Sequence, residues 1–267
     1  MSCNKPLLLI AVFLFSANVA QAGQYYFPII AAGFSNGAGT DQFWDTEILV
    51  TNPTSKNLNG FLTFYGPDGT ALSVTLRFVP GTAPGSVSTD QFFQFAIPAN
   101  GAWRAYTNEA DILKTGWVEL DTPDGEVSPV VVFSNNSRKS GLLSEGSVFP
   151  SYPATLQRLF SDYGPRSANI PQFTDTTVSD IGVAIANPTA NSANITMRLL
   201  NSAGVKAQEI QITLPPFCSV SRFVHELFSG LTGFQGTLEI QSDIGVAALG
   251  LRFTGPIFTT IPVVTLQ

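Results

Sequence analysis

The residues that could do chemistry in this chain are few, and the only histidine is the first of them. His225 stands alone in 267 residues, which excludes a multi-histidine metal site and leaves one possible general base. Ser219 and Ser221 lie close to it in sequence, so a Ser-His-Asp arrangement can be drawn. However, no Gly-x-Ser-x-Gly elbow is present and both serines fall in a strand pattern. We therefore expect no enzyme, and we interpret His225 as the polar start of a short helical turn.

Acidic pairs are the second candidate for chemistry. Asp41 with Asp45, and Asp121 with Asp124, could offer carboxylate oxygens to Ca²⁺ or act as the two carboxylates of a glycoside hydrolase. The stretch around Asp121 and Asp124 is equally typical of a turn, and no Asp-x-Asp-x-Asp-Gly loop is present. We predict no metal site and no cofactor, and leave open a calcium ion at the rim of a sandwich.

Cysteine use fits an exported protein without disulfides. Residues 1–22 resemble a secretory signal, with Lys5 before an apolar run and Ala20-Gln21-Ala22 before the expected cleavage point. Cys218 is the only cysteine after this segment, so no internal disulfide can form. We interpret it as a small, half-buried residue at the start of a strand. A location that is secreted, periplasmic or at the cell surface follows, with no membrane span after cleavage.

The net charge of −6 and the pI near 4.7 argue against nucleic acid as a partner, because phosphate binding needs clustered Lys and Arg. Arg138-Lys139 is the only adjacent basic pair.

Aromatic residues are the remaining candidates for binding. Trp117 lies two residues before Glu119 in an alternating segment, so both side chains should point to the same, outward face. We therefore predict that Trp117 is an exposed platform for a sugar ring or a partner protein. Phe92 and Phe93 end an insertion over residues 79–94, which is rich in Pro, Gly, Ser and Thr and is expected to be a surface loop. Trp103 is expected to pack in the interior.

The elements that would position these residues occur twice. Asp45–Thr54 reappears as Asp180–Thr189, and the glycines at 116 and 125 match those at 236 and 245. Apolar and polar residues alternate with period two, in phase between the copies, as in half-buried strands. The expected core pairs are Ile48 and Val50 with Val183 and Ile185, Leu62 and Phe64 with Met197 and Leu199, Val118 and Leu120 with Leu238 and Ile240, and Val131 and Phe133 with Leu251 and Phe253.

Turn residues separate these strands. Asn52-Pro53 and Asn187-Pro188 each end a strand, and the segments Gly66–Gly69 and Asn201–Gly204 are expected hairpin loops. One helical turn per copy is expected, at Asn108–Leu113 and His225–Phe228. The fold class that follows is all-β, with two tandem immunoglobulin-like antiparallel β-sandwich domains at 23–150 and 151–267 after the signal peptide at 1–22.

Several motifs together resemble a known family. They are Tyr26-Phe27-Pro28, the Asn-Pro stops, Leu214-Pro215-Pro216, Arg222-Phe223, Glu226-Leu227-Phe228, the segment Phe234–Leu238 and the segment Ala247–Phe253. Over most of the chain they are similar to the tandem β-sandwich repeat proteins that bacteria secrete, a family whose function is uncharacterised. The resemblance implies the fold and an exported location, and it transfers no catalytic residue.

Three functional classes remain open at this stage. The first is a secreted or cell-surface structural or interaction module that binds an unknown protein, and it is the one we favour. The second is a carbohydrate-binding accessory protein that uses the Trp117 face. The third is a small outer-membrane barrel, against which the 18 prolines and the domain-sized duplication argue.

Overall fold

The protein is all-β, and all its paired strands run antiparallel in the part of the chain that the structure describes. The structure is a computed structural model, which describes residues 23–35, 41–79, 86–108, 112–164 and 178–266. The expected signal peptide and residues 109–111 of the first expected helical turn lie outside these ranges. No helix in these ranges is long and apolar enough to cross a membrane.

Two groups of strands divide the chain, and each strand pairs only within its own group. The first half contains β1 (Gly23–Phe34), β2 (Gln42–Thr51), β3 (Leu58–Tyr65), β4 (Val74–Phe78), β5 (Val87–Asp90), β6 (Phe92–Ile97), β7 (Ala102–Thr107), β8 (Lys114–Thr122), β9 (Ser128–Ser137) and β10 (Gly141–Val148). The second half contains β11 (Ala154–Tyr163), β12 (Ser179–Ala186), β13 (Ala193–Asn201), β14 (Lys206–Leu214), β15 (Ser219–Phe223), α1 (Val224–Leu227), β16 (Phe234–Thr254), β17 (Ile257–Ile261) and β18 (Val263–Thr265).

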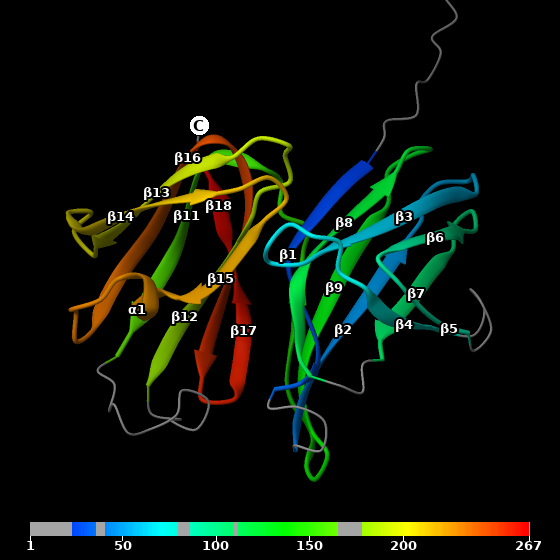
Figure 1. The fold of residues 1–267 in the computed structure, drawn as a ribbon, viewed down its shortest axis with the longest axis horizontal. Coiled ribbons are helices and arrows are strands. Elements are labelled where there is room, and N and C mark those ends of the chain that lie inside the picture. The colour runs from blue at the N-terminus through cyan, green and yellow to red at the C-terminus, as the bar shows by residue number, and fades with distance from the viewer. Residues whose placement is uncertain (1–22, 36–40, 80–85, 109–111, 165–177, 267) are drawn as a thin grey trace, which may run out of the picture.

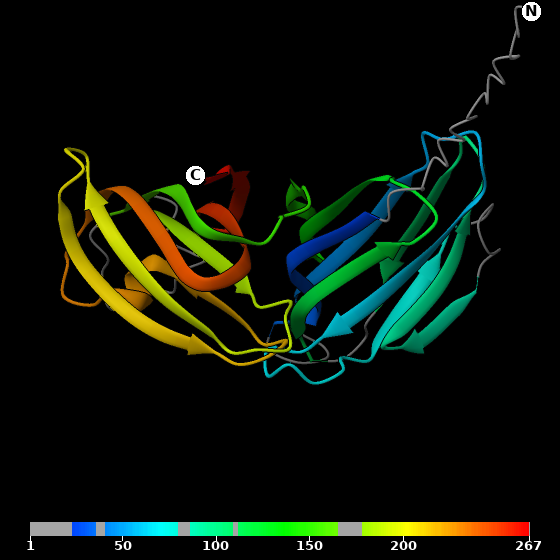
Figure 2. The same ribbon diagram turned by 90° about the horizontal axis from the view of Figure 1, so that it is seen from above.

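Each half has the layers of a sandwich, and the halves lie side by side (Figure 1). In the first half, β1, β8, β3 and β6 form one layer, and β5, β4, β7, β2, β9 and β10 form the other. In the second half, the long strand β16 belongs to both layers. It pairs with β11 and β13 through its first part and with β12 and β17 through its second. Seen from above, the halves open away from each other like a wide V (Figure 2).

The alternating pattern predicts burial correctly. All the expected core positions in both halves are buried, with at most 7% of any of these side chains exposed. Arg198 and Glu239, which follow core positions in the alternation, lie on the outer face of the second half, where Arg198 donates to Glu239 at 3.1 Å and to Glu209 at 2.7 Å. The burial of the expected core positions therefore follows from the sequence.

The asparagines of the two Asn-Pro stops are fully buried hydrogen-bonding centres. The Nδ2 of Asn52 donates to the carbonyls of Lys56, Ile97 and Pro98, at 2.7, 3.3 and 2.9 Å. The Nδ2 of Asn187 donates to three carbonyls at matching places, at 2.7, 3.0 and 3.0 Å. Each Oδ1 also accepts from the threonine two residues later. These side chains form hydrogen bonds with carbonyls that the strand ends leave unpaired. The sequence predicted only that each Asn-Pro pair ends a strand.

Two expectations about the last long strand are wrong. Leu251 and Phe253 are buried, but they do not face the interior of their own half. The ladder places Leu251 opposite Gly182, whereas Glu47, the counterpart of Gly182, stands opposite Val132. Leu251 therefore corresponds to Val132 rather than to Val131. The reason is that β16 has one residue fewer than the matching stretch of the first half, between the part that pairs with β11 and β13 and the part that pairs with β12. A one-residue shift moves every following side chain to the other face.

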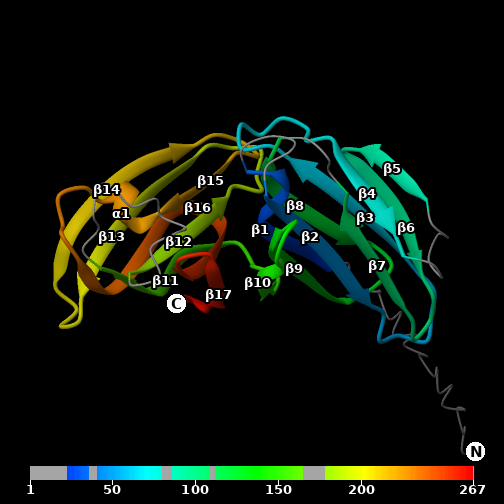
Figure 3. The same ribbon diagram turned by 90° about the horizontal axis from the view of Figure 1, so that it is seen from below.

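The consequence is a hydrophobic core that both halves share. Leu251 and Phe253 of β16 and Phe258 of β17 belong to one cluster of buried side chains with Trp44 and Phe133 of the first half. The ring of Phe258 lies 5.7 Å from that of Trp44 and 5.3 Å from that of Phe133, between centroids. Figure 3 shows β9 and β10 beside β17 at this seam. The outer face of the second half thus packs against the first half and covers part of its hydrophobic core.

The insertion at 79–94 is not a plain surface loop. Residues 80–85 lie outside the described ranges, but Val87–Asp90 forms β5, which pairs with β4. Phe92 begins β6, which pairs with β3. The second expected helical turn is confirmed as α1.

Candidate functional site

Trp117 does not form the exposed platform expected from its parity. Its side chain is fully buried, with the Nε1–H donating to the carbonyl of Phe217 at 2.8 Å. The indole stacks on Tyr65, with centroids 4.3 Å apart, and Tyr65 in turn stacks on Phe217. Trp117 does point out of its own half, but the second half covers it. Alternation predicts which face a side chain occupies and not what lies against that face.

The other two candidate binding residues differ from each other. Phe92 is 47% exposed and stacks on Phe61, while Phe93 is buried against Phe64 and Phe78. They are adjacent in an edge strand, so their side chains point to opposite faces. Phe92 alone is available to a partner. Trp103 is buried and stacks on Phe95 at 4.0 Å, as expected.

His225 lies in α1 and contacts a buried carboxylate. Its Nδ1 is 2.6 Å from Oδ2 of Asp180, whose side chain is fully buried, and the imidazole is 27% exposed. A carboxylate and an imidazole make two of the three members of a hydrolytic triad. Among the described residues, neither Ser219 nor Ser221 forms a side-chain hydrogen bond with His225, so the structure does not join either of the two expected serines to the pair.

The remaining candidates for chemistry are spread over the molecule. Cys218 is a buried free thiol whose pKa is raised by burial and by the charge of Asp68, so the unreactive protonated form is favoured. Asp41 accepts hydrogen bonds from Ser137 and the Lys139 backbone. Asp124 accepts from Asn59 at 3.0 Å. Within the described residues no three His, Cys, Asp or Glu side chains gather as a metal site would require.

The segment that joins the halves carries exposed aromatic side chains that belong to none of the sequence motifs above. We call residues 149–153 the connector; they read Phe149-Pro150-Ser151-Tyr152-Pro153. Phe149 is 70% exposed and Tyr152 is 62% exposed, far more than most aromatic side chains in folded proteins. The sequence did contain a signal for these residues, because a short segment between two repeats places each aromatic residue directly before a proline.

Ser151 fixes the connector to both halves. Its backbone N–H donates to the carbonyl of Tyr26 in β1 at 2.8 Å. Its hydroxyl accepts from the N–H of Ala248 in β16 at 2.9 Å. The flanking prolines restrict the backbone further, because their rings fix φ. The two exposed aromatic side chains are therefore held by a segment that is already ordered.

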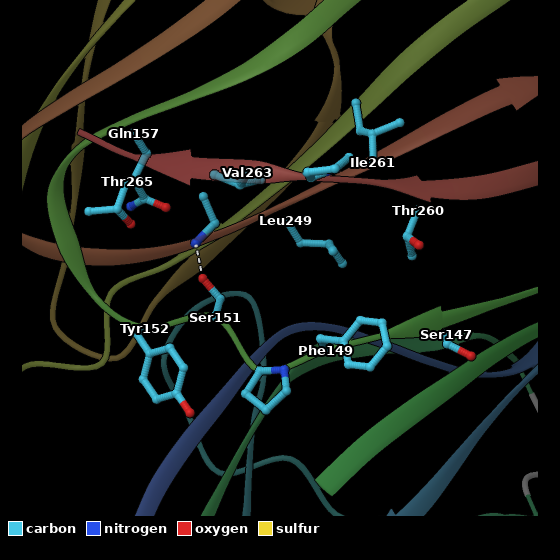
Figure 4. Close-up of a pocket in the computed structure, with 13 residues that line it drawn as sticks. Ser147, Phe149, Ser151, Tyr152, Gln157, Leu249, Thr260, Ile261, Val263 and Thr265 are labelled. Atoms are coloured by element: carbon cyan, nitrogen blue, oxygen red, sulfur yellow. Dashed lines mark hydrogen bonds between the residues drawn. The ribbon is translucent and has the colours of Figure 1, made fainter. Parts of the chain in front are cut away.

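A cleft of about 370 Å³ lies between the connector and the strands of the second half; we call it the connector cleft. Figure 4 shows Phe149 and Tyr152 on the connector side, opposite Ile261 and Val263, with Leu249 between them. Polar groups around it come from Ser147, Thr260 and Thr265. No Asp, Glu, His, Lys, Arg or Cys is among the described residues that line it. The lining can offer apolar contact and hydrogen bonds, and it holds no pair suited to acid–base chemistry.

Comparisons with known proteins do not place the chain in a family. No family model matches the sequence, and no curated protein matches it. Among solved structures, the chain is aligned with the crystal structure of Momordica charantia 7S globulin, at 10% sequence identity and a TM-score of 0.21. That alignment covers 85% of this chain and 86% of the globulin chain. Similarity at this level carries no argument about function.

Proposed function

We propose that this protein is a non-enzymatic interaction module that binds a partner protein through the connector cleft. The observation that carries the proposal is the pair of exposed rings, Phe149 and Tyr152, beside an uncharged cleft. Aromatic side chains at the centre of a patch supply much of the binding energy in protein interfaces. Apolar strand residues such as Ile261 and Val263 provide the opposite wall. The partner segment would insert an apolar side chain between these walls.

The attachment of Ser151 supports the same function. Binding by a mobile segment is weakened by the entropy lost when the segment becomes ordered. Here the two hydrogen bonds of Ser151 already fix the connector in the free protein. The rings of Phe149 and Tyr152 can therefore contact a partner at little additional entropic cost.

The test is selection of peptides from a displayed library on the wild-type protein, followed by binding to a Phe149→Ser/Tyr152→Ser variant. We expect the selected peptides to bind the variant at least about 30-fold more weakly, since central aromatic residues contribute roughly 2 kcal/mol or more. The variant should melt close to the wild type, because both side chains are exposed.

A matched control removes two exposed apolar side chains elsewhere. Leu142→Ser/Phe160→Ser changes residues that are 57% and 45% exposed and that do not line the cleft. It should leave peptide binding unchanged. Equal losses in both double variants, or selected peptides that bind the connector variant as well as the wild type, would show that the cleft is not the binding site.

A glycan is the second candidate ligand. The hydroxyl groups of Ser147, Thr260 and Thr265 line the same cleft as the exposed Tyr152 ring, and carbohydrate sites combine such groups with a ring on which a sugar face stacks. A glycan array probed with the wild type and with the same double variant separates this ligand class from peptides. Binding to glycans alone would favour the accessory-protein function.

The cellular setting and the division of the chain belong to the same proposal. Residues 1–22 serve as a bacterial secretory signal, and the protein acts outside the cytoplasm, in the periplasm, at the cell surface or in the medium. Residues 23–150 and 151–267 form tandem immunoglobulin-like domains of the secreted repeat type. His225 is not among the described residues that line the connector cleft, so His225→Ala should leave partner binding intact.

A further inference from the structure

The strand β6 forms one edge of the first half. It pairs with β3 on one side and with no described strand on the other. Figure 3 shows it on the side of the first half that lies away from the second half. An open strand edge presents a row of unpaired backbone N–H and C=O groups, to which another strand can be added.

This edge lacks the features by which proteins usually protect a free strand. None of the six residues of β6 is charged and none is a proline, and its ladder with β3 has no register shift. The edge strand β14 of the second half differs, because it carries Lys206 and Glu209 and its ladder with β13 contains a register shift. Charges and bulges are the usual means of preventing strand addition. Their absence from β6 indicates that its edge is available for pairing.

The backbone groups that point to the open side belong to Phe92, Gln94 and Ala96. The Phe64 N–H of β3 donates to the Gln91 carbonyl at 2.9 Å, so Gln91 directs its backbone groups toward β3. In an antiparallel strand this direction alternates from residue to residue. The side chains of Phe92, Gln94 and Ala96 are also exposed, on the outer face of the sheet. An added strand would therefore form its hydrogen bonds with these three residues.

We propose that this edge binds the same edge of a second copy of the chain, in an antiparallel two-fold arrangement centred on Gln94. The two Gln94 residues then exchange N–H···O=C bonds, and Ala96 of each copy pairs with Phe92 of the other. All three open residues of each copy gain a partner in this register. Moving the axis to Phe93 or Phe95 would leave Ala96 or Phe92 without a partner in the other β6.

The register keeps like faces together. Directly opposite residues of an antiparallel pair lie on the same face of a sheet. The buried Phe93 therefore lies opposite the buried Phe95 of the second copy, and both rings stay on the inner face. The exposed Phe92 lies opposite Ala96, a small residue that leaves room for the ring. The sheet of one copy thus continues into the sheet of the other.

Charged side chains of opposite sign stand at the two ends of β6. Asp90 lies at the beginning, where its Oδ1 accepts from the Phe92 N–H at 3.4 Å. The exposed Lys56 lies near the other end, because the Nδ2 of Asn52 donates to the carbonyls of both Lys56 and Pro98, at 2.7 and 2.9 Å. The open edge is therefore acidic at one end and basic at the other.

This distribution of charge fits a second copy in the antiparallel direction. Pairing centred on Gln94 places Asp90 opposite Pro98 of the other copy, and so beside the Lys56 of that copy. The two-fold axis makes this contact twice. A parallel arrangement would instead bring the two Asp90 side chains together. Exposed ion pairs contribute little energy, so the charges select the direction and the backbone bonds hold the strands.

A hollow of about 440 Å³ beside β6 shows that the two layers are not closely packed at this edge. Phe93 and Phe95 of β6 line it from one layer, and Phe78, Ser88 and Trp103 line it from the other. A second copy bound along β6 would cover this side of the sandwich. The interface is independent of the connector cleft, whose described lining contains no residue of β6.

The experiment is analytical ultracentrifugation of the protein over a concentration series, with variants at the proposed axis. The wild type should be a dimer at high concentration and dissociate on dilution. Gln94→Pro removes the central N–H on the open side, where an edge strand tolerates proline. It should raise the dimer dissociation constant at least about tenfold, because both central backbone bonds are lost. Gln94→Lys and Gln94→Glu should also weaken the dimer, since each places like charges directly opposite each other.

A mixture of Gln94→Lys and Gln94→Glu tests the register. The axis places residue 94 of one copy against residue 94 of the other, so the mixture should form a one-to-one dimer at least about tenfold tighter than either variant alone. Both variants should melt like the wild type at a concentration where the wild type is monomeric, because Gln94 is exposed. Gln211→Lys, at an exposed glutamine of β14, is the matched control and should dimerise normally.

A wild-type protein that stays monomeric up to its highest soluble concentration overturns the proposal. A dimer that Gln94→Pro and Gln94→Lys leave unchanged overturns it as well, because another surface would then hold the copies together. Lys and Glu variants that weaken the dimer but do not recover on mixing would contradict an axis at Gln94. The Phe149→Ser/Tyr152→Ser variant should dimerise like the wild type, which separates this result from the test of the connector cleft.

Discussion

The Ser144 hydroxyl in β10 forms two hydrogen bonds with the backbone of Phe258 in β17, accepting from its N–H at 2.8 Å and donating to its carbonyl at 3.1 Å. The two residues belong to different halves, and their strands lie edge to edge without a regular ladder. One side chain thus satisfies backbone groups that would otherwise be unpaired where the halves meet. The Phe258 ring packs into the shared core next to this contact.

Ser144→Ala should destabilise the protein by about 1–3 kcal/mol, because it leaves a buried N–H and a buried carbonyl without partners. Chemical denaturation measures the loss. Ser147→Ala, an exposed serine of the same strand, should change stability by no more than about 0.5 kcal/mol. Equal stability of the two variants would mean that the seam contact contributes nothing.

Trp117→Ala should cost about 3–5 kcal/mol of stability, because it removes a fully buried indole between the halves. Trp117→Phe keeps an aromatic ring against Tyr65 and removes the hydrogen bond to Phe217, so its cost should be smaller, with about 1 kcal/mol from the lost bond. Thermal melts of both variants test the order. A Trp117→Ala protein as stable as the wild type would restore the exposed platform that sequence parity predicts.

Asn52→Ala and Asn187→Ala should destabilise the protein to a similar extent, about 3 kcal/mol each, since each removes three donated bonds to otherwise unpaired carbonyls. Unfolding in denaturant gives both values. Asn59→Ala, an exposed asparagine, serves as the control. A loss below about 1 kcal/mol at either buried site would argue against its role as a strand-end tie.

Burial raises the pKa of Asp45 from 3.8 to about 6. The folded state therefore holds this proton more tightly than the unfolded state does, and the stability gained from protonation is lost as pH rises through the folded pKa. Compared with Asp45→Asn, the wild type should lose stability between about pH 4 and pH 7. Stability curves for the two proteins across that range measure the difference. Parallel curves would mean that Asp45 is solvated in the folded state.

Side-chain alternation predicted the strands and their burial, because one-sided burial imposes period two whatever covers the face. It could not predict that Trp117 is covered, since the covering surface comes from Phe217 in the other half. The register error at Leu251 and Phe253 has a related cause. Sequence matching aligned Leu251 with Val131, whereas the strand ladder aligns it with Val132. A difference of one residue within β16 turns every later side chain to the opposite face.

The candidate site was less accessible to prediction than the fold. Phe149 and Tyr152 lie in a segment between the repeats, so neither alternation nor internal matching singles them out. Their importance comes from the bonds of Ser151 to Tyr26 and Ala248, which are contacts between distant parts of the chain. The residue types of the connector were visible in the sequence, but its attachment to both halves was not.

Hydrogen–deuterium exchange with and without a peptide selected on the wild type tests the central claim most directly, because it locates the bound ligand without assuming a site. We predict slower exchange in residues 147–152 and 260–265, which border the connector cleft, and unchanged exchange in β5 and β6. Protection confined to β5 and β6, around the exposed Phe92, would contradict the account and move the binding site to the far edge of the first half.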